Sequence, residues 1–297
     1  MTALLQAFSD EEGPARRLAQ ALGIQAAIVD VHRFPDGEIL PRVPKCADTT
    51  VVYRSLNHPN DKIIELVLAA EAWRRNGVRR LVLVAPYLCY MRQDKAFSAG
   101  EPISQRAIGR LLGGLFDRVI TVDAHLHRTP TLAEVFPGRE CVNLRGAGAI
   151  AGFFRTRGVP PGLVVVGPDA ESRQWAEAVA GSLDAVCAVL TKERRDDAHV
   201  VLHPPAALFV SGKPVLIVDD VASSGATLIQ ASRLLSAAGA SSLMIAVTHA
   251  LFDAAVTETL RSLGVTEIFS GDSCLHATNA IPLAPILAEA LRSETMR

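Results

Sequence analysis

The chain has 297 residues, 49% of them hydrophobic and 21% charged, which is enough to bury one large core or two smaller ones. A formal net charge of −1 argues against a nucleic-acid or membrane-binding surface. No apolar stretch is long enough to span a bilayer, and residues 1–13 lack the basic start and apolar core of a secretion signal. The five cysteines are scattered without zinc-like spacing, so we expect reduced thiols in a cytoplasmic protein.

Short apolar runs alternate with helical patterns along the chain. The runs that we predict as strands, each rich in Val, Ile or Leu, are Leu81–Pro86, Arg118–Val122, Leu163–Val166, Val215–Val218 and Ser242–Val247. The helical patterns, with apolar residues three or four apart, are Asp61–Arg75, Ile103–Phe116, Trp175–Leu183 and Leu228–Ala238. This alternation predicts an α/β fold in which mostly parallel sheets are flanked by helices.

The two halves of the chain have a similar rhythm of strands and helices, which suggests an internal duplication. We therefore predict two similar domains, residues 1–144 and residues 145–297, with the boundary near Asn143–Gly148. The tail from Pro282 to Arg297 has the pattern of a short closing helix. We expect this helix to pack back onto the first domain.

Polar residues gather directly after four of the five predicted strands. In chain order these groups are Arg92-Gln93-Asp94, Asp123 with His125, Asp169, and Asp219-Asp220. In open α/β sheets, ligands bind beyond the carboxyl ends of the strands. The convergence of these groups predicts a functional site and is stronger evidence than any single residue.

The segment Arg33–Glu38 is a turn signal flanked by apolar residues. Two acidic residues in an exposed turn usually contribute only to solubility. Next to Phe34, however, the carboxylates of Asp36 and Glu38 could accept hydrogen bonds from an adenine while the aromatic ring stacks on it. We treat this binding interpretation as dependent on the rest of the site.

A charged loop follows the predicted strand Leu81–Pro86. Arg92 carries a fork of donors suited to phosphate oxygens, Gln93 can donate to the same group, and Lys95 adds charge nearby. The loop therefore predicts a polyphosphate contact. The alternative is a solvated charged turn.

The segment Thr121–Arg128 places Asp123, His125 and His127 at alternate positions, which share a face in an extended chain. A histidine with nearby carboxylates can hold a divalent cation, although Mg²⁺ prefers oxygen ligands and keeps several waters. Structural zinc needs three or four convergent nitrogen or sulfur ligands, and no cysteine is near. The alternative is a hydrogen-bonded histidine pair at a strand end.

Two further segments allow a nucleotide interpretation. Gly146–Ala151 matches the G-x-G-x-x-A dinucleotide fingerprint, but the segment before it is a poor strand, so we interpret it as a helix start rich in small residues. The charge run Leu190–Asp197 is typical of a solvated loop and would also suit a mobile lid that brings Lys and Arg onto a polyphosphate. The chain has no Walker A sequence, so any ATP must be held without a P-loop.

The most informative run is Val215–Leu228, an apolar strand that ends in Asp219-Asp220 and is followed by a loop of small residues and an amphipathic helix. Backbone N–H groups and hydroxyls near a helix N-terminus favour a phosphate. The paired carboxylates suit the vicinal hydroxyls of a sugar or a hydrated cation. The run predicts a sugar-phosphate site, with a strand–turn–helix carrying two solvated Asp as the alternative.

This run resembles the phosphoribosyl pyrophosphate (PRPP) binding motif of type I phosphoribosyltransferases and PRPP synthetases. The motif has two acidic residues, two apolar residues and Asp-Thr-Gly-Gly-Thr, and here Ser223, Ser224 and Ala226 replace its third Asp, its first Thr and one Gly. Further segments resemble the ribose-phosphate pyrophosphokinase (PRPP synthetase) family, closer to its archaeal-type branch. They are Phe34–Glu38, Arg92-Gln93-Asp94, Asp123-Ala124-His125, Gly167-Pro168-Asp169 and Lys192-Glu193-Arg194.

The resemblance implies two phosphoribosyltransferase-like domains, the first for ATP and the second for ribose 5-phosphate. It implies Mg²⁺-dependent transfer of the diphosphoryl group of ATP to the 1-hydroxyl of ribose 5-phosphate, giving PRPP and AMP. It also implies a homo-oligomer in which a neighbouring subunit contributes the adenine loop. The implied roles are catalysis by Lys192 and Arg194; ATP binding by Phe34, Asp36, Gly37, Glu38, Arg92, Gln93 and Asp94; ribose 5-phosphate binding by Arg194, Asp219, Asp220, Ser223, Ser224, Gly225, Ala226 and Thr227; and metal binding by His125 and Asp169.

Two other functions remain open on the sequence. A phosphoribosyltransferase that uses PRPP would share the PRPP loop but not Arg92-Gln93-Asp94 or Phe34–Glu38. A non-catalytic, synthetase-like regulatory subunit would account for the missing third Asp. The presence of both Lys192 and Arg194 argues against that second alternative.

Overall fold

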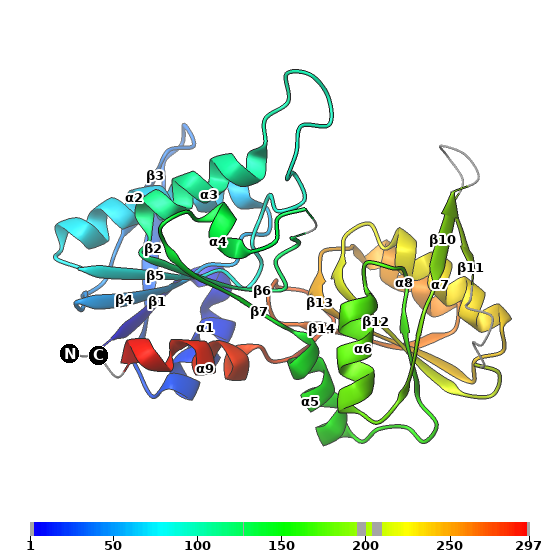
Figure 1. The fold of residues 1–297 in the computed structure, drawn as a ribbon. Helices are drawn as coiled ribbons and strands as arrows, with labels where there is room; N and C mark the ends of the chain where they lie inside the picture. Colours follow the sequence, from blue (N-terminus) through cyan, green and yellow to red (C-terminus); the bar gives the residue numbers. More distant parts are fainter. Residues whose placement is uncertain (1–2, 127, 195–199, 204–209, 296–297) are drawn as a thin grey trace. The chain divides into compact units, whose positions relative to one another are not determined.

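The computed structural model describes residues 3–126, 128–194, 200–203 and 210–295, and for residues 192–194 and 200–203 it describes the backbone alone. The chain divides into two compact units (Figure 1). The first unit consists of Met1–Leu144 and Leu283–Arg297, and the second unit is Arg145–Pro282. Each unit is built on a mostly parallel sheet with helices on its faces, which confirms the predicted fold class.

The first unit has a seven-stranded sheet in the order β3-β2-β1-β4-β5-β6-β7. All neighbouring strands are parallel except the antiparallel pair of β2 and β3. The strands are β1 (Leu4–Phe8), β2 (Ala26–Arg33), β3 (Ile39–Arg42), β4 (Thr49–Tyr53), β5 (Arg80–Val84), β6 (Arg118–Val122) and β7 (Glu140–Leu144). The helices are the 3₁₀ turn η1 (Ser9–Glu11), α1 (Glu12–Leu22), α2 (Pro59–Arg75), α3 (Ser104–Leu115), α4 (Leu132–Val135) and α9 (Ala284–Thr295).

Both faces of this sheet are covered, because its strands are apolar on both sides. Helices α2 and α3 lie over one face, and α1 packs against α9 on the other (Figure 1). On the first face Trp73 is fully buried beside Leu83 and Phe116, and its indole Nε1 donates to Gln6 Oε1 at 2.7 Å. Because a buried indole N–H needs an acceptor, this bond also fixes β1 against α2.

A buried carboxylate holds α9 in the first unit. Glu294 is 1% exposed and accepts hydrogen bonds from Arg80 Nε at 2.6 Å and from Arg118 Nη1 at 2.8 Å. Arg80 also pairs with Glu140 at 2.7 Å. Burial alone would raise the pKa of Glu294, but the hydrogen bonds and charges of the two arginines outweigh it and lower that pKa. Since Arg80 and Arg118 begin β5 and β6, the cluster lies at the amino edge of the sheet.

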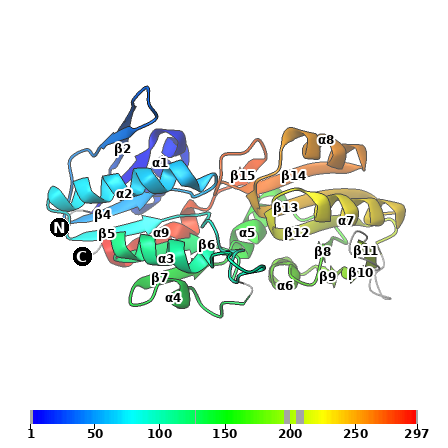
Figure 2. The same ribbon diagram turned by 90° about the horizontal axis from the view of Figure 1, so that it is seen from above.

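The second unit has a six-stranded parallel sheet in the order β15-β14-β13-β12-β8-β9, and a separate antiparallel ribbon, β10-β11. The strands are β8 (Val164–Gly167), β9 (Val186–Val189), β10 (Thr191–Arg194), β11 (Val200–His203), β12 (Pro214–Ala222), β13 (Ser242–Ala250), β14 (Val265–Gly271) and β15 (Asn279–Ile281). The helices are α5 (Ala147–Arg157), α6 (Arg173–Ser182), α7 (Ala226–Ala237) and α8 (Ala254–Ser262), all visible in Figure 2.

Alternate residues of its central strands supply two cores. Val215 and Ile217 pack with α7 and α8 on one face, whereas Leu216 and Val218 pack with α5 and α6 on the other. Each strand is therefore apolar at successive positions, which is why the sequence shows continuous runs rather than alternation. This burial fixes the carboxyl ends of β8, β12, β13 and β14 at one edge of the sheet.

The structure corrects one feature of the sequence prediction. The strand predicted as Val215–Val218 continues to Ala222, because its ladder with β13 extends to Ala222 opposite Ala250. Asp219 and Asp220 therefore lie within β12 and not in the loop after it. Residues 3–30, for which the sequence analysis predicts no element, contain β1, η1, α1 and most of β2.

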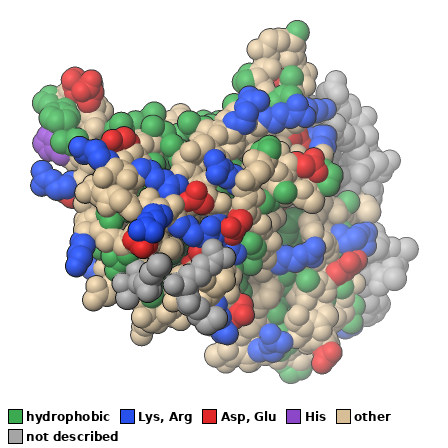
Figure 3. All heavy atoms as spheres, turned by 60° about the vertical axis from the view of Figure 1, so that its left-hand side comes forward, with side chains coloured by type: hydrophobic (Ala, Val, Ile, Leu, Met, Phe, Trp, Pro, Cys, Tyr) green, Lys and Arg blue, Asp and Glu red, His purple; other side chains and the backbone are tan. Residues whose placement is uncertain are grey.

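In the space-filling view, basic and acidic side chains are intermingled over the face shown (Figure 3). This agrees with the near-neutral charge of the chain. None of the helices in the described part of the chain is long and apolar enough to cross a membrane.

Candidate active site

The carboxyl end of β12 combines two buried carboxylates with the start of α7. Asp219 is 8% exposed and Asp220 is 6% exposed, although both are charged residues at a sheet edge. Backbone N–H groups accompany them: Asp220 N donates to Asp219 Oδ1 at 3.0 Å, and Val221 N donates to Asp220 Oδ1 at 2.8 Å. The carboxylates are therefore held in fixed orientations next to the loop.

The surroundings of Asp219 disfavour its negative charge. Burial is the main cause that raises its pKa well above the usual value, and the nearby charges of Asp220 and Asp169 raise it further. A carboxylate in this position is stabilised by whatever brings positive charge or hydroxyl donors to it. Because such perturbed groups concentrate at functional sites, this cluster is the best candidate site in the second unit.

The loop after β12 is shaped by a glycine. Gly225 has φ +71°, in the left-handed region, and stands at the N-cap of α7. A Cβ atom there would lie 2.3 Å from Val256 Cγ1, so only glycine fits. Ser223 and Ser224 are exposed, and the first turn of α7 holds no acidic residue. The arrangement leaves hydroxyls beside a helix N-terminus that suits an anion.

Asp169 is held by its own turn. It follows β8, is 7% exposed, and its Oδ1 accepts from the backbone N–H groups of Glu171 and Ser172, both at 3.1 Å. Ser172 completes the turn, because its Oγ donates to the carbonyl of Asp169 at 2.6 Å. Gly167 permits this close approach, since a Cβ there would lie 2.6 Å from Ser172 Oγ.

In the first unit, Phe34–Glu38 is the tip of the β2–β3 hairpin. Phe34 N donates to the carbonyl of Glu38 at 2.8 Å, and Gly37 has φ +95°. The ring of Phe34 is 40% exposed and contacts His32 edge to face, with ring centroids 4.5 Å apart. Asp36 and Glu38 are exposed, so the turn presents an aromatic face beside two acceptors.

The predicted ATP residues after β5 divide into two kinds. Arg92 and Gln93 are exposed and available to a ligand. The carboxylate of Asp94 is 2% exposed and pairs with Arg128 at 3.0 Å. Asp94 therefore fixes the loop and orients a second guanidinium, whereas its neighbours face solvent.

The carboxyl end of β6 carries a backbone outlier. Asp123 is 4% exposed and has φ +42°, a region that non-glycine residues rarely occupy. The carbonyl of Leu144 and the side chain of Asn143 hold the segment, accepting from Asp123 N at 2.8 Å and Ala124 N at 2.9 Å. His125 follows, half-buried. Such strain persists mainly at functional sites, and the sequence pattern gave no sign of it.

Some predicted side chains lie outside the described part of the chain. The predicted catalytic pair, Lys192 and Arg194, lies in β10, and both side chains fall outside the described residues, as does His127. The predicted metal residues belong to different units, His125 to the first and Asp169 to the second. Within the described ranges, no three His, Cys, Asp or Glu side chains cluster closely enough to hold a metal ion.

The structure also shows polar groups at the two carboxyl edges that sequence reasoning missed. In the second unit, His249 at the end of β13 is 1% exposed, and its Nδ1 lies 2.7 Å from Ser273 Oγ. In the first unit, Arg54 after β4 is 3% exposed and pairs with acidic residues of η1 and α2. No local signal marks either group, because their partners lie far away in the sequence.

Comparisons with known proteins identify similar sequences and a similar fold. A family model described as the N-terminal domain of ribose phosphate pyrophosphokinase matches residues 4–114, and a phosphoribosyl transferase domain model matches residues 146–272. A ribose-phosphate pyrophosphokinase of Methanopyrus kandleri is 35% identical over 284 residues, 94% of each chain. One of Thermococcus kodakarensis is 38% identical over 261 residues, 88% of each chain. The crystal structure of phosphoribosylpyrophosphate synthetase from Mycobacterium smegmatis superposes with a TM-score of 0.82 at 25% identity, covering 99% of each chain.

Proposed function

Because the chain belongs to the ribose-phosphate pyrophosphokinase family, as the sequence resemblance predicted, we propose that it synthesises PRPP. The reaction would transfer the β,γ-diphosphoryl group of ATP to the 1-hydroxyl of ribose 5-phosphate and release AMP. The observation that supports this most directly is the pair of buried carboxylates, Asp219 and Asp220, beside the glycine-shaped N-terminus of α7. A sugar that carries a phosphate satisfies both halves of that arrangement.

Ribose 5-phosphate would bind at this edge of the second unit. Asp219 and Asp220 would accept hydrogen bonds from the ribose hydroxyls, which relieves the unfavourable burial that raises the pKa of Asp219. The 5-phosphate would lie in the loop of Ser223, Ser224, Gly225, Ala226 and Thr227, where hydroxyls meet the helix dipole. Arg194 would add a positive charge from the ribbon.

ATP would be held by residues of the first unit. Arg92 and Gln93 are exposed donors suited to the polyphosphate, and Asp94 keeps their loop in place through its ion pair with Arg128. At the hairpin tip, Phe34 would stack on the adenine while Asp36, Gly37 and Glu38 supply hydrogen bonds. We expect this hairpin to serve a neighbouring subunit in a homo-oligomer.

We also propose a magnesium ion, as the family resemblance implies. The unfavourable charge at Asp219, next to Asp220 and Asp169, is the kind that a divalent cation offsets, and oxygen ligands are those that Mg²⁺ prefers. His125 and Asp169 would hold it, and its chemistry would be to neutralise charge on the diphosphate. The chain's own contribution is to align the 1-hydroxyl with the β-phosphorus and to stabilise the transferring group through Lys192, Arg194 and Arg92.

The decisive experiment is a product assay on the full chain. Its conditions should resemble the cytoplasm, where we expect the protein to act. ATP, ribose 5-phosphate and Mg²⁺ should yield AMP and PRPP, and phosphorus NMR should detect both products. No AMP should form when ribose 5-phosphate is left out. Folded protein that forms no AMP would contradict the proposal. PRPP and a nucleobase, incubated without ATP, should release no pyrophosphate.

A variant of Lys192 separates a role in the transition state from a role in binding. Lys192→Ala should lower kcat about a thousandfold, in the range found for cations that stabilise a transferring phosphoryl group, and leave the Kd for ATP within about twofold. Equal losses in kcat and in ATP affinity would contradict the assigned role.

A further inference from the structure

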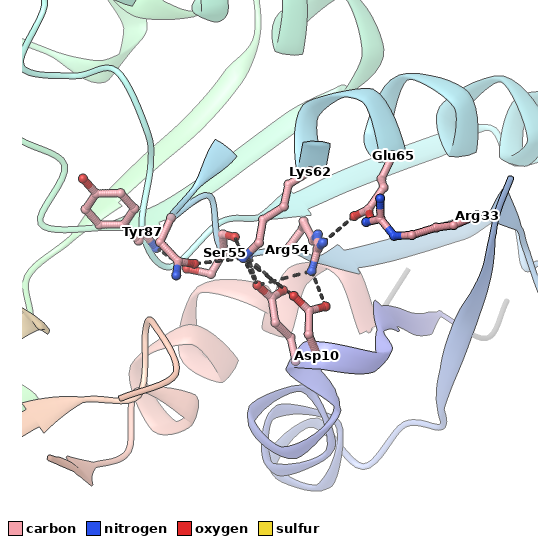
Figure 4. A network of polar contacts seen from close by, with 9 residues as sticks. Asp10, Arg33, Arg54, Ser55, Lys62, Glu65 and Tyr87 are labelled. Carbon is pink, nitrogen blue, oxygen red and sulfur yellow. Dashed lines mark hydrogen bonds and ion pairs between the residues drawn. The ribbon is translucent and has the colours of Figure 1, made fainter. Parts of the chain in front are cut away.

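A connected group of charged side chains lies at the carboxyl edge of the sheet in the first unit (Figure 4). Its members come from η1, from the ends of β2 and β4, and from α2, and none of them belongs to the proposed ATP residues. We call this group the Arg54 network. It consists of Asp10, Glu11, Arg33, Arg54, Lys62 and Glu65.

Arg54 is the centre of the network. Its guanidinium is 3% exposed and stacks over the ring of Phe8 at 4.4 Å. Nη1 contacts Asp10 at 2.5 Å and Glu11 at 3.5 Å, while Nη2 pairs with Glu65. Arg54 Nε has no hydrogen-bond partner within the described part of the chain. Burying an incompletely satisfied charge is unfavourable, and apolar side chains of similar volume often hold a fold equally well, so stability alone does not explain the network.

One end of the network reaches the hairpin. Glu65 Oε1 accepts from Arg33 Nη2 at 3.1 Å, and its other oxygen pairs with Arg54. Arg33 is the last residue of β2 and directly precedes Phe34, so this pair holds the base of the turn. Because Glu65 is 5% exposed and emerges from α2, the anchor is rigid.

The other end reaches the loop that carries Arg92 and Gln93. Glu11 accepts from Ser55 N at 3.0 Å and from Lys62 Nζ at 2.9 Å, and Lys62 also donates to the carbonyl of Ser55 at 2.7 Å. Ser55 Oγ then accepts from Tyr87 N at 3.2 Å, and Leu56 N donates to the carbonyl of Tyr87 at 2.8 Å. The start of the β5–α3 loop is therefore tied to the same group of charges.

From this continuity we infer that the Arg54 network is a positioning device, which couples the placement of the hairpin tip to that of the Arg92 loop. The inference rests on the proposed function, in which both segments contact ATP, and it holds whether the hairpin serves its own protomer or a neighbour. Fixing two distant contacts before the ligand arrives reduces the ordering cost of binding. Arg54 and Glu65 are positioning residues, because neither touches the substrate in this arrangement.

Glu65→Gln tests the inference, because Arg33 and Arg54 pair with different oxygens of Glu65, and the amide NH₂ group that replaces one of these oxygens cannot accept a hydrogen bond. We expect the KM for ATP to rise about tenfold, because Glu65 acts on the ATP contacts only through other residues, with the KM for ribose 5-phosphate unchanged. Glu294→Gln is the matched control, because Glu294 is also a buried carboxylate between two arginines, at the opposite edge of the same sheet. It should lower the melting temperature and leave both KM values unchanged.

A second variant keeps the test decisive if Glu65→Gln folds poorly, and hydrogen exchange adds a second readout. Arg33 is 56% exposed, so Arg33→Met should fold normally while raising the KM for ATP several-fold. Hydrogen exchange should increase in residues 34–38 and 86–95 together in Glu65→Gln, and this readout needs no activity. If the wild type makes no PRPP but the exchange remains coupled, only the proposed function fails. If exchange rises in one segment alone, or neither variant changes the KM for ATP, the inference is wrong.

Discussion

Glu294 in the first unit and Asp219 in the second are both buried carboxylates, with 1% and 8% of their surface exposed. Their surroundings shift their pKa values in opposite directions. Glu294 lies between Arg80 and Arg118, whose hydrogen bonds and charges outweigh the effect of burial and lower its pKa. Asp219 lies beside Asp220 and Asp169, so burial and like charges both raise its pKa.

The difference separates a charge with a structural role, at Glu294, from a charge that we propose to be functional, at Asp219. The protein itself provides the partners of Glu294, and the pair holds α9 to the sheet. Among the described residues, no cation is found to offset the charge of Asp219, so the described fold bears an unfavourable interaction that a ligand can remove. Sites of this kind lower the free energy of unfolding but favour ligand binding, and they are typical of functional sites.

The largest effect should follow from removing the unfavourable charges. The double variant Asp219→Asn with Asp220→Asn should lower kcat/KM for ribose 5-phosphate roughly a thousandfold, with about thirtyfold for each lost charge-assisted hydrogen bond. Its melting temperature should equal or exceed that of the wild type, because like-charge repulsion is removed. A lower melting temperature with activity retained would reverse the assignment of these residues.

The converse effect is expected at Glu294. Glu294→Gln should lower the free energy of unfolding by about 3 kcal/mol, since the buried carboxylate that two half-buried arginines share is lost, while kcat stays unchanged below the unfolding temperature. The chain has two tryptophans, Trp73 in the first unit and Trp175 in the second, so the Trp175→Phe background makes Trp73 fluorescence report on the first unit alone. A loss of activity without a loss of stability would contradict the structural role.

A substitution at Gly225 tests whether the loop beside Asp219 needs a glycine. Gly225→Ala should cost about 2–3 kcal/mol, because the left-handed backbone is strained and the new Cβ meets Val256. Gly212→Ala is the matched control, since Gly212 has φ +72° and nothing within 4 Å of a Cβ, and it should cost only about 1 kcal/mol. Urea denaturation measures both. Adding Val256→Ala should restore part of the loss at Gly225 alone; equal costs at the two glycines would refute the steric argument.

The smallest effect is a difference in pH dependence. The folded pKa of Glu294 lies below its usual 4.5, so its stabilising contribution is present above 4.5 and is lost as the pH falls through the folded pKa. The folded pKa of Asp219 lies above its usual 3.8, so stability is lost as the pH rises from 3.8 through the folded pKa. In EDTA without substrates, the stability advantage of Asp219→Asn over the wild type should therefore grow as the pH rises above 3.8. The deficit of Glu294→Gln should instead shrink below 4.5. Parallel pH profiles for the two variants would contradict the opposite shifts.

Local sequence patterns predicted the features of this molecule that depend on residues adjacent in the sequence. Continuous apolar runs identified β5, β6, β8, β12 and β13, because strands buried on both faces need apolar residues at every position. The run from Val215 to Leu228 predicted a sugar-phosphate site, because the small residues and the helix start are contiguous. The carboxylates looked like turn residues, however, and only the ladder to β13 shows that β12 continues past them.

Features that depend on distant partners could not be predicted. Glu11 accepts from Ser55, 44 residues away in sequence, so no spacing rule identifies the Arg54 network. The need for glycine at 225 comes from Val256, on another helix. Strand β2 mixes apolar residues with Asp30, His32 and Arg33, because it lies near the edge of the sheet. It therefore lacks the continuous apolar run that identified the predicted strands.

The division of the first unit into two stretches of chain has a consequence for biogenesis. Residues 145–282 are contiguous and can fold as soon as they leave the ribosome, whereas the first sheet lacks α9 until residues 283–297 have been synthesised. The face of that sheet on which α1 packs against α9 therefore lacks part of its cover during translation of the whole second unit. We expect nascent chains stalled before residue 283 to be recognised by chaperones through that face, and chains released beyond it to escape them.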